Sequence, residues 1–226
     1  MVRGAPDSWS GAVIADRYRL DSLLGSGGAG AVYRGRDLQL DRTVAIKLLT
    51  KEYFAGGLVG FEAEATAASR VNHPNAVAIY DLGSWNELPY LVMEEAPGTS
   101  LATLLDQGPL DVDRSIHIAA QILDALAEAH RCGVIHCDLS SDNVIVNDDG
   151  SDHVTVIDFG LARLGDSSRA ERLFGTAEYL APEQIRSGIT TPAVDLYATG
   201  ILLYEMLVGR TPFAGVEDSV ILDGHL

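Results

Sequence analysis

The sequence is poor in cysteine and in basic residues, and both shortages exclude classes of protein. The two cysteines, Cys132 and Cys137, lie five residues apart and indicate neither a disulfide-stabilised secreted protein nor a metal site. Sixteen basic residues stand against 32 acidic ones, which gives a net charge of −16. This balance argues against binding to a nucleic-acid backbone or to an anionic membrane.

Long apolar runs are also missing. The most apolar stretch, residues 201–208, is too short to span a bilayer and contains Glu205. Residues 1–16 lack the sustained apolar stretch of a signal peptide, so we expect a soluble, cytoplasmic chain with no membrane segment. Residues 1–15 contain Gly, Pro and Ser and are expected to form a flexible N-terminal tail before a domain at 16–226.

The stretch 134–160 organises the rest of the chain. Its β-branched runs, 144–146 and 154–157, predict two strands, and the Asn, Asp and Gly residues at 147–150 are typical of a hairpin turn. A tight hairpin would bring together two polar residues that lie just outside these strands, Asn143 and Asp158.

Asn143 and Asp158 offer an amide carbonyl and a carboxylate. These hard oxygen ligands suit a Mg²⁺ ion that also contacts phosphates. Asp138 lies on the same loop, where it could orient or deprotonate a hydroxyl.

Residues 136–143, His-Cys-Asp-Leu-Ser-Ser-Asp-Asn, resemble the catalytic loop of eukaryotic-like protein kinases, and residues 158–160 resemble their Asp-Phe-Gly motif. The resemblance implies an α+β, bilobal protein-kinase-like fold. The N-lobe, 16–95, would hold a small antiparallel sheet with one helix, and the C-lobe, 96–226, would be mainly helical and incomplete.

Residues 25–30 form a Gly-x-Gly-x-x-Gly pattern, which dinucleotide-binding folds also contain. Here the pattern lies between strand-like segments, whereas a dinucleotide loop opens a helix. Strand, glycine turn and strand predict a flap whose backbone N–H groups approach triphosphate oxygens. The segment is similar to the kinase glycine-rich loop, including the following Val32.

The strand-like run 43–49 places Lys47 among apolar residues, where a lysine is costly unless it is paired. Kinases pair this lysine with phosphates and with a helix glutamate. The alanine-rich helix predicted at 58–71 offers Glu62 and Glu64. The Phe-x-x-Glu-Ala pattern resembles the family at Glu64, which we take as the partner of Lys47.

Two further strands are predicted at 76–82 and 89–93, followed by a break at 94–98. By resemblance, this break is the hinge whose backbone binds adenine, at Glu94 and Ala96, with Met93 gating the pocket. The complete set of expected ATP-binding residues is Leu24, Gly25, Ser26, Gly27, Gly28, Ala29, Gly30, Val32, Ala45, Lys47, Met93, Glu94, Ala96 and Ile145.

Two long helices are predicted beyond the hinge. Asp111 is a candidate N-cap for the first, which runs to Gly133. Thr191 and Pro192 open the second, which is apolar on most sides and should be buried all round. The expected buried face of the first helix is formed by Ile116, Ala119, Ala120, Leu123, Leu126, Ala127 and His130.

Residues 175–183 are similar to the end of a kinase activation segment. That segment would contain Ser167, Ser168, Thr176 and Glu183. The resemblance gives His136, Phe159 and Asp195 structural roles, with Asp195 holding the catalytic-loop backbone.

In order, these motifs look like those of bacterial, eukaryotic-like (Hanks-type) serine/threonine protein kinases. The resemblance implies that ATP and Mg²⁺ are the cofactors and that proteins are the substrates. The catalytic residues would be Lys47, Glu64, Asp138 and Asn143, and the metal ligands Asn143 and Asp158.

Two residues depart from the family pattern. Ser140 stands where these kinases carry a lysine that helps to neutralise the transferring phosphoryl group, so activity could be weak. Cys137 replaces the arginine that would pair with an activation-loop phosphate, so we expect activity to be independent of phosphorylation at Ser167 and Ser168.

The family also continues with further helices beyond the position of Leu226, one of which bears an arginine that pairs with the equivalent of Glu183. A C-terminally truncated lobe would expose an apolar helix surface, which a partner protein or a second copy could cover.

Three functions therefore stay open. The first is a Ser/Thr protein kinase, the second a nucleotide-binding pseudokinase that acts as a scaffold or allosteric partner, and the third a small-molecule phosphotransferase. The peptide platform at 175–183 speaks against the third.

Overall fold

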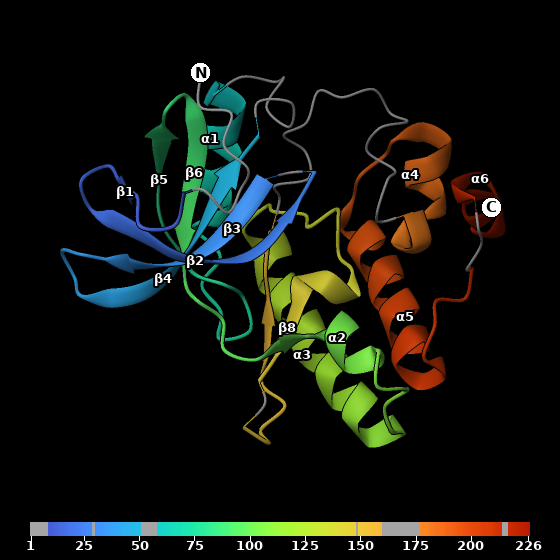
Figure 1. Ribbon diagram of the computed structural model, residues 1–226. Coiled ribbons are helices and arrows are strands. Elements are labelled where there is room, and N and C mark those ends of the chain that lie inside the picture. Colours follow the sequence, from blue (N-terminus) through green and yellow to red (C-terminus); the bar gives the residue numbers. More distant parts are fainter. Residues whose placement is uncertain (1–8, 29, 51–57, 148, 160–176, 214–216) are drawn as a thin grey trace. The chain divides into compact units, whose positions relative to one another are not determined.

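The computed structural model describes residues 9–28, 30–50, 58–147, 149–159, 177–213 and 217–226 (Figure 1). The described residues pack as two units. Unit 1 contains the residues up to Ser69 together with Ala78–Glu95, and unit 2 contains Arg70–Val77 and the residues from Ala96 onward. The α+β class expected from the sequence is confirmed, because unit 1 is built on a sheet and unit 2 mainly on helices.

Unit 1 is built on a six-stranded antiparallel sheet in the order β1-β2-β3-β4-β6-β5 (Figure 1). Irregular register between β2 and β3, at Leu20/Ser22 and Leu23/Gly25, curls this part of the sheet. The strands are β1 (Val13–Ile14), β2 (Tyr18–Gly27), β3 (Gly30–Asp37), β4 (Arg42–Leu49), β5 (Ile79–Trp85) and β6 (Leu88–Met93).

The core of unit 1 follows the two-residue period in β3 and at the start of β2, whereas β4 and β6 are buried at consecutive positions. Tyr18 and Leu20 on β2 are almost fully buried, as are Tyr33 on β3 and Ile46 on β4. Each large apolar side chain buried in this way contributes about 1.5–3 kcal/mol to folding. Helix α1 (Leu58–Ala68) belongs to the same unit and ends three residues before the predicted end at 71.

Ordered structure begins inside the segment that the sequence assigned to a flexible tail. The Gly11 amide donates to the Leu20 carbonyl at 2.7 Å, and β1 pairs with β2. The Trp9 ring packs edge-on against Trp85 at 5.9 Å. Residues 9–15 are therefore part of unit 1, because a tryptophan and paired backbone groups hold them to the sheet.

Unit 2 carries a small three-stranded sheet in the order β7-β8-β9 and a set of helices. The strands are β7 (Thr99–Ser100), β8 (Val144–Val146) and β9 (Val154–Val156). The helices are α2 (Leu101–Leu105), α3 (Val112–Arg131), α4 (Pro182–Ser187), α5 (Pro192–Val208) and α6 (Asp218–Gly224), with short 3₁₀ turns η3 (Ser141–Asn143) and η6 (Ala177–Tyr179).

Helix α3 begins where the sequence predicts, but its buried face differs from the prediction. The Asp111 carboxylate accepts a hydrogen bond from the Arg114 amide at 2.9 Å, which confirms the N-cap. Ile116 and Leu123, expected inside, are 56% and 40% exposed. Ala119 and Leu126 are buried as predicted, whereas Ala120 and Ala127 are also exposed. The rest of the buried face is formed by Ser115, Ile118, Ile122, Ala125 and Ala129.

Helix α5 opens with Pro192 at its first position and closes at Gly209, which has a left-handed φ of 79°. The expected burial on all sides is wrong. One side packs on α3, while Leu196, Tyr204 and Leu207 are exposed.

The strand predicted at 76–82 is divided. Ala76 forms an isolated parallel bridge with Val156, and the Val77 amide donates to the Val156 carbonyl at 2.9 Å. This segment therefore belongs to unit 2, and β5 begins only at Ile79 in unit 1. Over the described ranges, no helix has the length and apolarity needed to cross a bilayer.

Candidate active site

The hairpin predicted in the central stretch sets the geometry of unit 2. Val144 pairs with Val156, and the Ile157 amide donates to the Asn143 carbonyl at 3.0 Å. Asn143 therefore lies across from Ile157, which directly precedes Asp158. The structure thus brings the two expected metal ligands to the same end of the strand pair.

Asp195 on α5 holds the backbone of the catalytic loop. Its carboxylate is 1% exposed and accepts the His136 amide on Oδ2 and the Cys137 amide on Oδ1, each at 2.9 Å. His130, in the last turn of α3, adds a third hydrogen bond from Nε2 to Oδ2 at 2.7 Å. A buried carboxylate with three donors is well satisfied, so it fixes the conformation of residues 136–137.

His136 ties the same loop to the strand that leads to Asp158. Its Nε2 donates to the Ile157 carbonyl at 2.8 Å, which leaves Nδ1 to accept the Asp138 amide at 3.3 Å. The fully buried ring also packs against Phe159, with 5.1 Å between ring centroids. The hydrogen bonds therefore select one neutral tautomer, with the proton on Nε2.

Asn143 is oriented by the loop itself. Its Nδ2 donates to the Asp138 carbonyl at 2.7 Å, which directs the amide nitrogen into the loop and leaves the amide oxygen as the acceptor. Together with the carboxylate of Asp158, this oxygen forms the kind of hard donor set that Mg²⁺ prefers, so the residues present fit such an ion.

Two non-glycine residues of the site have a left-handed backbone. Cys137 has φ of 66° and Asp158 has φ of 65°. Such conformations cost on the order of 1 kcal/mol or more and persist only where the surroundings enforce them. For Cys137, the bond from its amide to Asp195 supplies that constraint.

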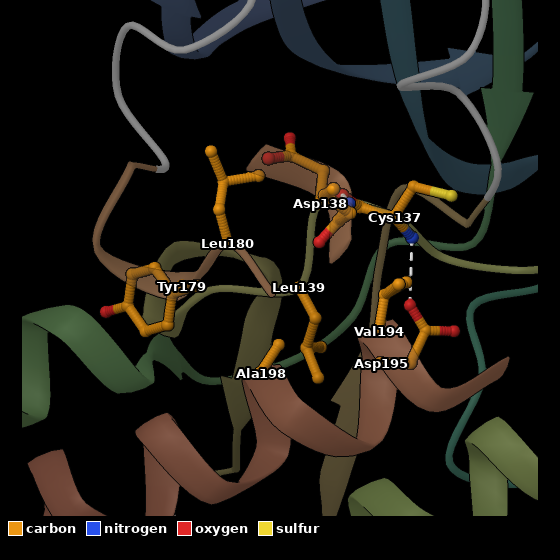
Figure 2. A pocket seen from close by; sticks show the side chains of 9 residues that line it. Cys137, Asp138, Leu139, Tyr179, Leu180, Val194, Asp195 and Ala198 are labelled. Carbon is orange, nitrogen blue, oxygen red and sulfur yellow. Dashed lines mark hydrogen bonds between the residues drawn. The ribbon is translucent and has the colours of Figure 1, made fainter. Parts of the chain in front are cut away.

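A small pocket lies beside Asp138 in unit 2 (Figure 2). Figure 2 shows Cys137 and Asp138 at one side of it, with the Cys137 amide bonded to Asp195. Gln184 also lines the pocket, and its Oε1 accepts the Ala181 amide at 2.9 Å. The lining residues are Cys137, Asp138, Leu139, Tyr179, Leu180, Gln184, Val194, Asp195 and Ala198.

The glycine loop of unit 1 is formed by the ends of β2 and β3, where Gly27 pairs with Gly30 and Gly25 with Val32. A side chain at Gly25, Gly27 or Gly28 would meet no atom within 4 Å, so the loop is open around these backbones. Ser26 pairs with Ala31 on the same ribbon. Leu24 is half exposed, and Ala29 lies outside the described residues.

Lys47 lies on β4, opposite Val32 on β3 and Leu91 on β6, with only 8% of its surface exposed. On α1, Glu64 is half-buried and lies about one helical turn after the buried Phe61. Glu62 is exposed. Of the two candidate glutamates, Glu64 is thus the one on the buried side of the helix, and its pairing with Lys47 stays a prediction.

The hinge candidates follow β6. Ala45 and the buried Met93 are paired across β4 and β6. The Glu94 amide donates to the Ala78 carbonyl at 2.8 Å, so the expected contact of Glu94 with adenine would have to be made by its carbonyl. Ala96, in unit 2, is half-buried, and Ile145 is partly exposed on β8.

The expected activation-segment residues Ser167, Ser168 and Thr176 lie outside the described residues. Glu183 is in the first turn of α4 and is half-buried.

Several polar residues of unit 2 were not singled out from the sequence. His130 was expected only to pack, whereas it bonds to Asp195. Tyr179, Ser141 and Glu205 form a hydrogen-bonded group. A histidine at the C-terminal turn of a helix, just before the loop motif, is the one local signal that could have indicated His130.

Comparison with known proteins places this geometry in a family. The model of the protein kinase domain matches residues 18–225. The chain is 40% identical over 219 residues to the serine/threonine-protein kinase PknL of Mycobacterium tuberculosis, covering 94% of this chain and 54% of that protein. It is 38% identical over 219 residues to PrkC of Bacillus subtilis, covering 94% and 34%, and 41% identical over 212 residues to the probable kinase PknB of Lactococcus lactis, covering 91% and 34%.

The chain spans about half, or less, of the length of these relatives. Their names support the kinase interpretation of the sequence and lend no support to the pseudokinase alternative. With a kinase model matched over most of its length and relatives of about 40% identity, this chain belongs to the protein kinase family, among the bacterial serine/threonine kinases.

Proposed function

We propose that this chain transfers the γ-phosphate of ATP to Ser or Thr hydroxyls of protein substrates, as part of signalling. The observation that carries the proposal is the catalytic loop, whose backbone is fixed by the buried Asp195 at His136 and Cys137. Phosphoryl transfer needs positioning and electrostatic stabilisation more than covalent chemistry, so a loop fixed before substrate arrives is suited to it.

In unit 2, Asp138 would accept or orient the proton of the substrate hydroxyl. Asn143 and Asp158 would hold Mg²⁺, which when bound neutralises negative charge on the phosphates. The bond from Asn143 Nδ2 to the Asp138 carbonyl supports this division of roles, because it couples the orientation of one residue to the position of the other.

In unit 1, Lys47 would hold the α- and β-phosphates and pair with Glu64, while the open backbones at Gly25, Gly27 and Gly28 approach the phosphates. Ala45, Met93 and the other apolar residues named above would enclose the adenine.

Ser140 is expected to limit the rate. A serine cannot supply the positive charge that a lysine would place near the transferring phosphoryl group, and removing one such stabilising group costs on the order of 10²–10³ in kcat. Ser140→Lys should therefore raise kcat while the thermal midpoint confirms that the variant is folded. An unchanged kcat in the folded variant would contradict this role.

Activation should not depend on a phosphate at Ser167 or Ser168, since Cys137 offers no positive charge to bind it. A variant with alanine at both serines should keep its turnover. Loss of most of the turnover would refute this expectation.

The central test follows the γ-phosphate. The chain is incubated with Mg²⁺, γ-labelled ATP and a Ser/Thr-containing protein substrate, with Asp138→Asn as the matched inactive control. Incorporation of label into the substrate well above that of the control supports the proposal, and incorporation equal to that of the control refutes it. A thermal shift on adding Mg-ATP, reduced in Asp158→Asn, tests nucleotide binding separately.

A further inference from the structure

A hydrogen-bonded group of two buried hydroxyls and the half-buried carboxylate of Glu205 joins the catalytic loop to two other elements of unit 2. The Tyr179 hydroxyl, at the end of η6, donates to Glu205 Oε2 on α5 at 2.7 Å. The Ser141 hydroxyl, at the start of η3, lies 2.9 Å from the Tyr179 oxygen and 3.4 Å from Glu205 Oε1. Ser141 and Tyr179 are only 5% and 7% exposed.

None of these three side chains takes part in the reaction proposed above. The group is nevertheless costly, because the half-buried carboxylate of Glu205 has lost part of its hydration and relies on the two hydroxyl donors to replace it. Removing one donor leaves a desolvated oxygen without its partner, and the remaining groups must shift to compensate.

The position of Ser141 in the chain connects this group to the expected catalytic residues. Ser141 is the first residue of the η3 turn, and Asn143 is the last. Asn143 in turn bonds to the carbonyl of Asp138. A hydrogen bond that fixes Ser141 therefore fixes the turn that carries one expected metal ligand and supports the expected catalytic carboxylate.

We propose that Ser141 is a positioning residue, which through Tyr179 and Glu205 sets the catalytic loop relative to the segment 177–180. The inference rests on the proposed kinase function, in which that segment precedes α4 as the platform for the substrate peptide. The hydrogen bonds of Ser141 would thereby keep the hydroxyl of the bound substrate in a fixed position relative to the Asp138 carboxylate.

The ionisation of Glu205 gives the group a measurable signature. Burial raises the pKa of Glu205, while the hydrogen bonds from Tyr179 and Ser141 lower it, and the carboxylates of Glu178 on η6 and Asp142 on η3 raise it further. When Glu205 takes up a proton, it loses acceptor capacity toward both hydroxyls. Removing the Ser141 donor should move this proton uptake to higher pH.

The test compares Ser141→Ala with Ser141→Thr, which keeps the hydroxyl, and with Ser115→Ala. Ser115 is a fully buried serine on α3 whose hydroxyl donates to the Asp111 carbonyl at 2.8 Å, so its variant matches the loss of a buried hydroxyl away from the site. Activity of the unmodified chain above Asp138→Asn is established first. Then kcat, KM for ATP and KM for the protein substrate are measured across roughly pH 5 to 8.

Ser141→Ala should lower kcat/KM for the protein substrate by about tenfold, the loss expected for one buried hydrogen bond, with KM for ATP nearly unchanged. The acid limb of the pH profile should move to higher pH, and Ser141→Thr should restore both. Kinetics like those of Ser115→Ala, or an acid limb that does not move, overturn the inference while leaving the kinase function intact. If the unmodified chain transfers no phosphate, both the proposed kinase function and this inference are refuted.

Discussion

Asp37, at the end of β3, is a buried carboxylate whose replacement should destabilise unit 1 in a pH-dependent way. It is 0% exposed and accepts Arg17 Nε on Oδ1 at 2.9 Å and Arg17 Nη2 on Oδ2 at 2.7 Å. The amides of Gln39 and Leu40 add bonds of 3.1 and 3.2 Å to Oδ1. Chiefly through Arg17, these donors lower the pKa of Asp37 from 3.8 to about 2.

The shift can be converted into stability by linkage. Because the folded pKa lies below the unfolded one, the carboxylate contributes stability that is present above about pH 4 and is lost as the pH falls toward 2. A difference of this size corresponds to about 2 kcal/mol at pH 7, of which roughly half is left at pH 3. Asp37→Asn should therefore cost about 2–3 kcal/mol at pH 7 and clearly less at pH 3.

Urea unfolding followed by tryptophan fluorescence suits this measurement, because the only two tryptophans, Trp9 and Trp85, both lie in unit 1 with Asp37. Asp41→Asn is the matched control. Asp41 pairs with Arg36 nearby, but its side chain is 83% exposed, so its loss should cost well under ~1 kcal/mol. A penalty for Asp37→Asn that is the same at pH 7 and pH 3, or no larger than that of the control, would refute the reasoning.

Three further predictions use other parts of the structure. Gly98 has φ of 119°, and a Cβ there would meet the Val146 carbonyl, so Gly98→Ala should lower the free energy of unfolding by roughly 2 kcal/mol or more. Gly200 lies in open space on α5, so Gly200→Ala should raise the free energy of unfolding by about 0.5–1 kcal/mol. Equal thermal midpoints for the two variants would contradict this. Replacing the fully buried Ile118 with alanine should lower the free energy of unfolding by about 2–5 kcal/mol, whereas the same change at the exposed Ile116 should lower it by less than about 0.5 kcal/mol. Chemical denaturation followed by circular dichroism measures both, and comparable losses would count against the assigned face of α3. Asp195→Asn should lower kcat roughly 10- to 100-fold with KM for ATP little changed, because an amide cannot accept all three of its donors, and an unaltered kcat would show that the loop does not depend on them.

Local chemistry was enough to predict the strands and the hairpin of the site. The mostly apolar run of β4 and the two short β-branched runs of β8 and β9 form strands within a residue or two of their predicted bounds. The hairpin register then places Asn143 opposite Ile157, because strand pairing leaves few alternatives. These features depend on neighbours in the sequence.

The face of α3 could not be predicted in the same way. Both sides of this helix carry large apolar residues, with Ile116 and Leu123 on the exposed side and Ile118, Ile122 and Leu126 on the buried side. The buried side also contains Ser115, Ala125 and Ala129, small residues that permit close packing but contribute little to an apolar pattern. Which side of α3 is buried depends on the residues that pack against it, and the periodicity of a single helix carries no information about them.

The polar contacts of the site were the least accessible to sequence reasoning. His130 and Asp195 are 65 residues apart, and Ser141 and Glu205 are 64 apart. No local pattern joins such pairs, and each becomes visible only when α5 packs beside α3 and the loop. The division of the predicted strand at 76–82 has the same origin, since Val156 competes for the backbone of Val77.

The left-handed backbone of Cys137 has a consequence for how the protein is made. The residue is locally frustrated, and the carboxylate that compensates it lies 58 residues further along the chain. A nascent chain that has emerged only as far as the catalytic motif therefore contains the sequence of the loop without the means to hold its shape. We therefore expect the loop to reach its native geometry only after α5 has been synthesised and has docked on unit 2.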